Sequence, residues 1–305
     1  MKYIKSCLNY TGGKYKLLPQ IIPLIPRDID TFYDIFCGGC NVGINVKANH
    51  IIFNDRMSEL IELYRNLSNV KYNEIVSDIE KIIEKFALSN TFKNGYEFYN
   101  CQSSKGLMDY NRESYLKLRT EYNRLKIEKN TNDIYLNLIL YILIVYGFNN
   151  QIRFNKKGQF NIPVGKRDFN QKVRSNLEKF ISKIAEKSVE FRNKDFKEFP
   201  FELIKKEDFV YLDPPYLVAT ATYNEQGGWN ENDEIELLSK LDYLNDKGIR
   251  FALSNVIENK GNTNNILEEW SKKYNINYLN YDYNNSNYQI KDKNQKTIEV
   301  LITNY

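Results

Sequence analysis

The chain has 305 residues, and 43 Lys and Arg against 39 Asp and Glu leave a formal net charge of +4. Its 42% hydrophobic and 14% aromatic residues exclude a disordered protein, because they are enough to build a sizeable core. The length predicts one large domain or two modest ones. A charge of this size identifies no partner, since it is common in proteins that bind no nucleic acid.

The sequence predicts a cytoplasmic protein with reduced cysteines. No apolar run reaches the roughly 18 to 20 residues that span a bilayer, and residues 1–10 lack the apolar centre of a signal peptide. We therefore expect neither secretion nor membrane insertion. Cys7, Cys37, Cys40 and Cys101 are too few for a disulfide framework in a chain of this length, so we interpret them as free thiols.

The first predicted elements form half of a nucleotide-binding α/β unit. Residues 32–36 are an apolar strand that ends in a glycine turn at 37–40, and residues 42–47 are typical of the start of a helix. A second strand at 51–53 ends before Asp55. Strand, glycine turn, helix, strand and acid in this order favour a doubly wound α/β sheet.

The pattern then becomes helical from residue 56 to about residue 146, with apolar residues such as Leu60, Leu63 and Leu67 three or four positions apart. Alternation of strands and helices returns after residue 187. The expected strands lie at residues 188–191, 209–212, 249–253, 276–279 and 298–302, and the expected helices at 233–244 and 264–273. These elements predict one doubly wound sheet with a mainly helical insertion between its second and third strands.

The most specific motif is D-P-P-Y at residues 213–216, directly after an apolar strand. Ligands of open α/β sheets gather at the carboxyl ends of strands. The two prolines fix the backbone, so the Asp213 carboxylate and the Pro214 carbonyl become rigid acceptors between which an amine would fit. Tyr216 offers a flat face for a planar ring. The simpler alternative is an Asp-Pro turn that only closes a strand.

The glycine turn at 37–40 lets the backbone approach a ligand closely, but it lacks the G-x-G-x-x-G spacing of dinucleotide sites. It therefore favours a smaller adenosine ligand. Asp55 can accept both ribose hydroxyls, or it can cap the following helix. Cys37 and Cys40 could be half of a zinc site, but the remaining Cys and the single His lack ligand spacing, so no metal is predicted.

Two basic segments complete the candidate sites. Gly-Gly followed by Lys14 at a helix start suits a carboxylate or phosphate, although an ordinary turn with an exposed Lys is possible. Basic and aromatic residues interleave over residues 154–174, which suits phosphates and bases together. A solvated charged face is the alternative for this second segment.

Taken in order, these motifs resemble the Dam-type DNA adenine-N6 methyltransferases, in which a target-recognition region precedes the D-P-P-Y motif. The resemblance covers nearly the whole chain: residues 10–14, 34–39, Asp55, 195–196, 213–216 and 299–302. It also covers residues 146–155 with 158–165, which are similar to the family's DNA-reading hairpin. Two departures are Cys40, where the F-x-G-x-G pattern has its second glycine, and Tyr10, where the family often has Trp.

The resemblance implies a Rossmann-like catalytic domain at residues 1–55 and 188–305 and a helical target-recognition domain at 56–187 with a hairpin near 149–165. It implies binding of S-adenosylmethionine and direct methyl transfer to a flipped adenine at Asp213, Pro214 and Tyr216. The implied cofactor-binding residues are Tyr10, Lys14, Asp34, Phe36, Gly38, Gly39, Asp55, Asp195, Phe196 and Asp213. The implied DNA-binding residues are Asn150, Arg153, Asn155, Lys156, Lys157, Lys166 and Arg167.

We thus expect a monomer that acts on double-stranded DNA in a bacterial or phage-infected cell, with a separate restriction endonuclease as a possible companion. Two alternatives from other classes stay open at this point. A methyltransferase of the same fold could act on RNA or protein glutamine, because a planar amide or base also fits an acid, proline and aromatic pocket. A nucleic-acid-binding module without catalysis would need no cofactor pocket.

Overall fold

The computed structural model describes residues 3–101, 103–128, 133–218, 228–280 and 297–305. The chain divides into two compact units. The helical unit comprises residues 1–13 and 57–187, and the sheet unit comprises residues 14–56 and 188–305. Residues 1–13 thus group with the helices, whereas the sequence analysis assigned them to the catalytic domain with the sheet.

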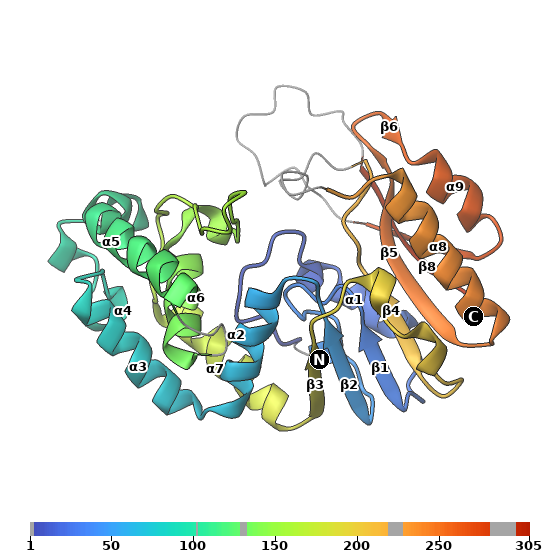
Figure 1. Cartoon of the computed structure of the whole chain (residues 1–305), viewed down its shortest axis with the longest axis horizontal. Helices are drawn as coiled ribbons and strands as arrows, with labels where there is room; N and C mark the ends of the chain where they lie inside the picture. The colour runs from blue at the N-terminus through green and yellow to red at the C-terminus, as the bar shows by residue number, and fades with distance from the viewer. Residues whose placement is uncertain (1–2, 102, 129–132, 219–227, 281–296) are drawn as a thin grey trace. The chain divides into compact units, whose positions relative to one another are not determined.

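The sheet unit is built on one sheet with strand order β3-β2-β1-β4-β5-β8-β7, and β6 pairs with β5 (Figure 1). The strands are β1 Thr31–Asp34, β2 His50–Asn54, β3 Ser188–Arg192, β4 Phe209–Leu212, β5 Arg250–Asn259, β6 Asn262–Thr263, β7 Asn275–Leu279 and β8 Thr297–Thr303. The strands from β3 to β5 in this order run parallel, whereas β8 is antiparallel to β5 and β7. The doubly wound α/β prediction is confirmed.

The central strands are apolar because both faces of the sheet are covered. All of β4 is buried, and Phe209 stacks on Phe32 of β1 with ring centroids 5.6 Å apart. Helix α8 (Glu231–Asp246) and helix α9 (Asn265–Ser271) pack against β5 (Figure 1). Before β1 lie the short helices η1 Lys14–Lys16, α1 Leu18–Ile21 and η2 Ile22–Leu24.

The helix expected at residues 42–47 is wrong, because the chain makes only one 3-10 turn there, η3 Gly43–Asn45. The Asn45 side chain donates to the Asn41 carbonyl at 2.8 Å, which satisfies that group locally. Val46 is then extended with ψ 149°, so the turn cannot propagate. The turn nevertheless presents its first backbone amide to the end of β1.

The helical unit packs around α6 (Ile134–Tyr146), which is buried from Leu136 to its end. Helices α2, α3 and α5 contact α6, and Tyr141 of α6 donates to the Cys7 carbonyl at 3.5 Å. The other helices of this unit are α2 Ser58–Asn69, α3 Tyr72–Lys85, α4 Thr91–Asn94, η4 Glu97–Tyr99, η5 Ser104–Gly106, α5 Leu107–Glu128, η6 Phe148–Asn150 and α7 Gln171–Ala185. Among the described residues, no helix is long and apolar enough to cross a membrane.

The hairpin predicted near residues 149–165 is present only as two isolated antiparallel bridges, Gly147 with Val164 and Phe154 with Phe160. Helix α5 supports this loop through side chains. Asn123 accepts from the Phe160 amide at 2.8 Å and donates to its carbonyl at 3.1 Å. These side-chain bonds take the place of a continuous ladder of backbone hydrogen bonds. The segment therefore follows the course of a hairpin without forming two regular strands.

In the sheet unit, the 3-10 turns η7 Phe196–Glu198 and η8 Phe201–Leu203 connect β3 to β4. Phe196, Phe199 and Phe201 are buried in the hydrophobic core that also holds Leu212 of β4 and Leu237 of α8. This connection places η7 immediately after the carboxyl end of β3.

Candidate active site

Four acidic residues follow four neighbouring parallel strands of the sheet. Asp34 ends β1, Asp55 follows β2, Asp195 comes after β3, and Asp213 follows β4. In the sheet, β1 lies next to β4. The chain adds β2 and β3 on the far side of β1 and adds β5 on the far side of β4, so the winding direction changes between β1 and β4. Ligands of open α/β sheets bind outside the carboxyl ends of the strands at such a switch point.

Asp34 is buried, with 2% of its surface exposed, and its Oδ2 accepts from the Gly43 amide at 3.3 Å. Burial is the main cause that raises the pKa of Asp34 to about 8; the Gly43 bond opposes the rise, and the Asp213 and Asp55 carboxylates add to it. Residue 43 must be glycine, because a Cβ there would lie 2.4 Å from the Phe53 ring. The close approach of η3 thus gives the buried Asp34 side chain its hydrogen-bond donor.

The glycine turn holds the second acid. Gly38 donates its amide to Asp55 Oδ2 at 3.1 Å, and the Cys37 amide donates to the Asn54 carbonyl at 2.9 Å. Cys40 closes the turn with a left-handed φ of +56°, and both cysteines are buried free thiols. Burial, followed by the hydrogen bond with Cys40, raises the pKa of the Cys37 thiol well above its usual value. The Cys37 thiol is thus protonated at neutral pH.

Three aromatic side chains lie together after β1, in η7 and before α8. The ring centroids are 5.6 Å apart for Phe36 and Phe196, 5.2 Å for Phe196 and Trp229, and 5.7 Å for Phe36 and Trp229. Phe36 and Phe196 are candidates from the sequence, whereas Trp229 is not. The one sequence feature that could have pointed to Trp229 is its place directly before Asn230, the residue that caps α8.

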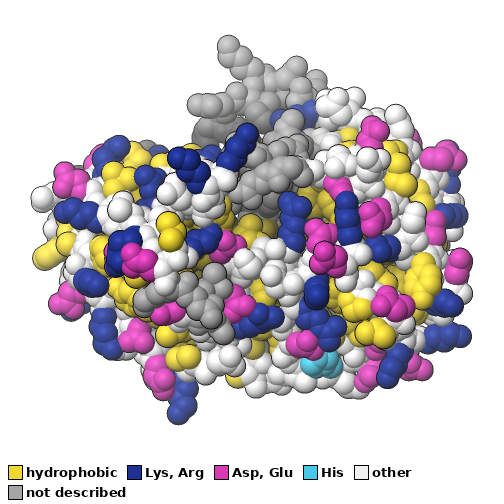
Figure 2. Space-filling model, viewed as in Figure 1, with side chains coloured by type: hydrophobic (Ala, Val, Ile, Leu, Met, Phe, Trp, Pro, Cys, Tyr) yellow, Lys and Arg dark blue, Asp and Glu magenta, His cyan; other side chains and the backbone are white. Residues whose placement is uncertain are grey.

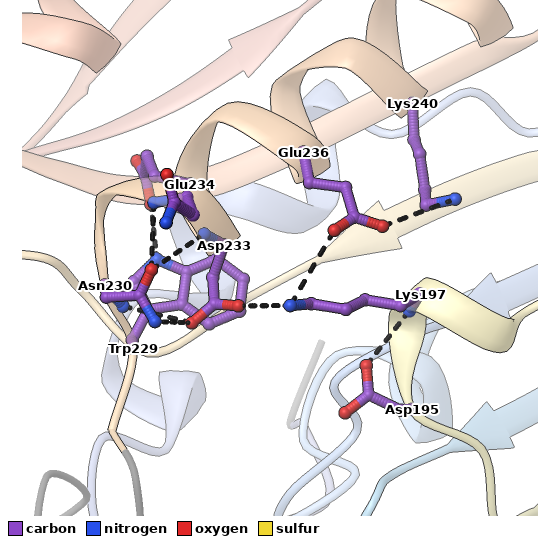
Figure 3. A network of polar contacts seen from close by, with 9 residues as sticks. Asp195, Lys197, Trp229, Asn230, Asp233, Glu234, Glu236 and Lys240 are labelled. Carbon is purple, nitrogen blue, oxygen red and sulfur yellow. Dashed lines mark hydrogen bonds and ion pairs between the residues drawn. The ribbon is translucent and has the colours of Figure 1, made fainter.

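Polar bonds tie this aromatic cluster to the start of α8 (Figure 3). Asp195 caps η7 by accepting from the Lys197 amide at 3.0 Å, and Lys197 Nζ pairs with Asp233 Oδ1 at 2.6 Å. The Trp229 indole N–H donates to Glu234 at 2.5 Å. The cap of α8 and η7 are therefore fixed to each other, which holds Phe196 beside Trp229.

Lys14, Asp213 and Tyr216 form an ionic cluster after β4, in which Lys14 is buried and Asp213 is 19% exposed. Lys14 Nζ lies 2.8 Å from Asp213 Oδ1 and donates to the Tyr216 hydroxyl, which in turn donates to the same Oδ1 at 2.9 Å. Burial raises the pKa of Asp213, and Lys14 opposes that rise. Burial lowers the pKa of Lys14, but the Asp213 and Glu299 carboxylates outweigh burial and raise it overall. The structure thus pairs a predicted cofactor-binding residue with the predicted catalytic acid.

Tyr216 therefore has a role at its hydroxyl that the motif alone did not indicate. The sequence analysis assigned its ring to stacking, and the structure shows its OH holding Asp213. Tyr10, the other predicted aromatic contact, belongs to the helical unit, where its carbonyl accepts from the Gly13 amide at 3.1 Å. Gly39 lies buried within the glycine turn.

In the helical unit, the predicted DNA-binding residues fall into two groups. Lys156 and Lys157 at the loop tip are exposed, and so are Lys166 and Arg167. The Asn155 side chain shapes the tip by accepting from the Lys157 amide at 2.9 Å. On the face drawn in Figure 2, Lys and Arg side chains are interspersed with Asp and Glu, so the cations there form no single-sign field.

The second group has bonds within the unit. Asn150 is buried, and its amide donates to the last carbonyls of α6, those of Ile144 at 3.0 Å and Val145 at 2.9 Å. Its Oδ1 accepts from Arg167 at 2.9 Å. Arg153 Nε donates to Asn161 Oδ1 at 2.8 Å across the loop. Asn150 thus orients Arg167, and Arg153 is braced by the opposite side of the loop.

Comparison with known proteins identifies the family. Residues 10–285 match the model of the D12 class N6 adenine-specific DNA methyltransferases. The chain belongs to this family.

Relatives agree with this membership. Modification methylase StsI of Streptococcus sanguinis is 43% identical over 312 residues, which cover 100% of this chain and 43% of the relative. Type II methyltransferase M.FokI of Planomicrobium okeanokoites is 42% identical over 99% of this chain and 43% of its own length. DNA adenine methylase of Escherichia coli (strain K12) is 27% identical over 73% of this chain and 69% of its own length. The chain thus spans under half of the first two relatives.

The glycine turn ends on a non-glycine residue in the left-handed region. Cys40 occupies a conformation that glycine adopts without strain, and the resemblance drawn from the sequence implies a glycine there. Within the described ranges, no group of three or more His, Cys, Asp and Glu side chains could hold a metal ion.

Proposed function

We propose that the chain transfers a methyl group from S-adenosylmethionine to the exocyclic N6 amine of adenine in double-stranded DNA. The observation that carries this proposal is the arrangement at Asp213. Lys14 and Tyr216 both donate to Oδ1, whereas no described residue donates to Oδ2. The carboxylate is thus clamped through one oxygen while the other is available to a substrate amine.

The residues at the strand ends fit the cofactor. Asp55 would accept the ribose hydroxyls, and the Asp195 and Phe196 turn with Trp229 would hold the adenine ring. Burial is the main cause of the high pKa of Asp34, and the Asp213 and Asp55 carboxylates also raise it. Carboxylates at this edge of the sheet would favour a cation such as a sulfonium. When bound, S-adenosylmethionine supplies an activated methyl group whose neutral sulfur leaves with the electrons of the broken bond.

The protein's own task is to make the adenine amine nucleophilic. Its lone pair is delocalised into the ring, so it attacks poorly in the planar form. Asp213 Oδ2 and the Pro214 carbonyl would each accept one hydrogen, which draws the nitrogen toward tetrahedral geometry and directs its lone pair outward. The proton that the methylated amine must lose then passes to the Asp213 carboxylate or to water. Tyr216 would contribute its ring to the base and its OH to Asp213.

The target nitrogen is inaccessible within a duplex, so we propose that the base leaves the stack, at a cost of a few kcal/mol. Exposed Lys156, Lys157 and Lys166 would bind phosphates, and Arg153 and Arg167 would lie in the groove. Asn155 would support the loop tip and Asn150 would hold Arg167 in place. We assign DNA binding to the helical unit and the cofactor to the sheet unit.

The names of the relatives support a role in restriction-modification. Because the first two relatives are more than twice as long as the region that matches, we treat the activity, the substrate and the partners of the whole protein as proposals. We propose a monomer that acts in the cytoplasm, where bacterial or phage DNA lies, beside a restriction endonuclease that acts separately. The family membership disfavours the RNA, glutamine and non-enzymatic alternatives.

Methyl transfer from labelled S-adenosylmethionine to duplex DNA tests this proposal. We expect Asp213→Ala to lower kcat by at least about a hundredfold while cofactor binding stays measurable, because the carboxylate acts mainly in the transition state. Asp208→Asn is a matched control, since buried Asp208 precedes the same strand and accepts from the Thr31 amide at 3.1 Å. It should lower stability and leave kcat within about twofold. Substantial turnover by Asp213→Ala, or transfer to RNA rather than DNA by the wild type, would contradict the proposal.

A further inference from the structure

A buried glutamate lies beside the Asp213 clamp, by which we mean Lys14 and the Tyr216 hydroxyl, the two groups that donate to Asp213 Oδ1. Glu299 lies within β8, with 2% of its side chain exposed, and Val300, Leu301 and Ile302 after it are fully buried. An ionised carboxylate inside an apolar strand is costly unless partners compensate its lost hydration. Its position alone therefore calls for an explanation.

Two members of the clamp face this carboxylate. Glu299 Oε1 lies 3.6 Å from Lys14 Nζ and 3.5 Å from the Tyr216 hydroxyl. Asp213 Oδ1 holds the same two groups at shorter range, 2.8 Å and 2.9 Å. Lys14 therefore stands between two carboxylates, nearer to Asp213 than to Glu299.

This arrangement changes the charge that a substrate meets. A lone ion pair of Lys14 with Asp213 would be neutral, and a neutralised carboxylate is a weaker acceptor. With Glu299 beside the same lysine, the formal charges of one lysine and two acids sum to −1. The adenine nitrogen gains positive charge as it is methylated, so a negative site stabilises the transition state more than the ground state.

We propose that Glu299 is a positioning residue that shares the charge of Lys14 and so keeps the cluster around Asp213 negative toward the substrate amine. This inference rests on the proposed methyl transfer and adds a residue to it. Glu299 touches no substrate atom in this scheme. It acts through Lys14 and the Tyr216 hydroxyl.

A double-mutant cycle in the full chain tests the inference, with kcat and KM measured for Glu299→Gln, Lys14→Met and the double variant. Glu299→Gln makes the cluster neutral, and we expect kcat to fall about tenfold with KM changed less than about threefold. Lys14→Met takes the cluster to −2 and also loosens the clamp. The double variant returns the charge to −1, so we expect its kcat to equal or exceed that of Lys14→Met.

A matched control separates charge sharing from simple loss of a buried acid. Glu234 is also buried in the sheet unit, but it accepts from Trp229, Asn255 and Asn264. We expect the effects of Glu234→Gln and Lys14→Met to multiply. If those of Glu299→Gln and Lys14→Met multiply in the same way, Glu299 is only structural and the inference is overturned.

Folding and activity are controlled separately. Glu299→Asp keeps the charge, so kcat should stay within about threefold of the wild type even if Glu299→Gln is poorly folded. A loss as large as that of Glu299→Gln in a folded Glu299→Asp variant would contradict charge sharing. A wild-type chain that methylates no DNA would reject the proposed function itself, and with it this inference, whereas multiplicative losses in an active enzyme would reject the inference alone.

Discussion

Cys40 adopts a backbone conformation that L-residues other than glycine rarely hold. Its φ is +56° and its side chain is fully buried, at a place where the sequence resemblance implies a glycine. A left-handed residue with a Cβ costs roughly 1 to 2 kcal/mol, partly balanced by the higher unfolded-state entropy of glycine. The thiol packing and the backbone strain therefore act in opposite directions at one residue.

Comparing two substitutions isolates the strain. Cys40→Ala removes the thiol and keeps the Cβ, whereas Cys40→Gly removes both. We expect Cys40→Gly to be more stable than Cys40→Ala by about 1 kcal/mol in urea unfolding, because only the glycine variant relieves the left-handed strain. Equal free energies of unfolding for the two variants would show that the turn is not strained.

Asp34 makes stability depend on pH. Its pKa is raised by burial to about 8 in the folded state, against an ordinary value of 3.8, so the native state holds the proton more tightly than the unfolded chain. The unfavourable contribution of Asp34 therefore grows as pH rises from about 4 to about 8 and is constant above that range. We expect Asp34→Asn to gain free energy of unfolding relative to the wild type over this window, in denaturant titrations without cofactor. Parallel pH curves for the two proteins would contradict this assignment.

At the scale of elements, the loop between α6 and α7 is built from side-chain bonds rather than from strands. Its tip is set by Asn155, its base by Asn150, and its two sides are joined by Arg153 and Asn161. The guanidinium of Arg153 thus has a partner within the loop that competes with any guanine. An experiment must therefore distinguish two roles of Arg153, contact with a DNA base and support of the loop.

Arg153→Ala distinguishes these roles. A guanine contact predicts relaxed preference at one base pair, worth about 1 to 3 kcal/mol, whereas a phosphate contact predicts equal weakening on every sequence and a salt slope shallower by about one unit. We expect relaxed preference. Asn161→Ala is the control, because it removes the shorter, side-chain bond of the brace and keeps the guanidinium. If Asn161→Ala relaxes the preference as much as Arg153→Ala, bracing and not base contact explains the effect.

At the scale of the whole molecule, sequence patterns predicted the strands of the sheet well, but they did not predict the side-chain hydrogen bonds and ion pairs. Strand β4 was predicted at its observed bounds, since a strand buried on both faces reads as an unbroken apolar run between polar residues. The helix predicted at residues 42–47 was wrong because the choice between a helix and a single turn depended on the Asn45 side chain. Trp229 and Glu299 were missed as site residues because their partners are distant in sequence. A lone Glu in an apolar strand was the available signal for Glu299.

The parallel register of β2 and β3 has a consequence for exchanging target preference between such proteins. His50 pairs with Ser188 and Asn54 with Arg192, so the chain leaves β2 at one end of the pair and must enter β3 at the other. The helical insertion is therefore the crossover itself, and a parallel pair needs a dozen or more residues for that path. A chimaera cannot simply join residue 56 to residue 188. It must also bring the donor's counterpart of residues 1–13, because Cys7 and Leu8 are buried and Tyr141 of α6 bonds to the Cys7 carbonyl.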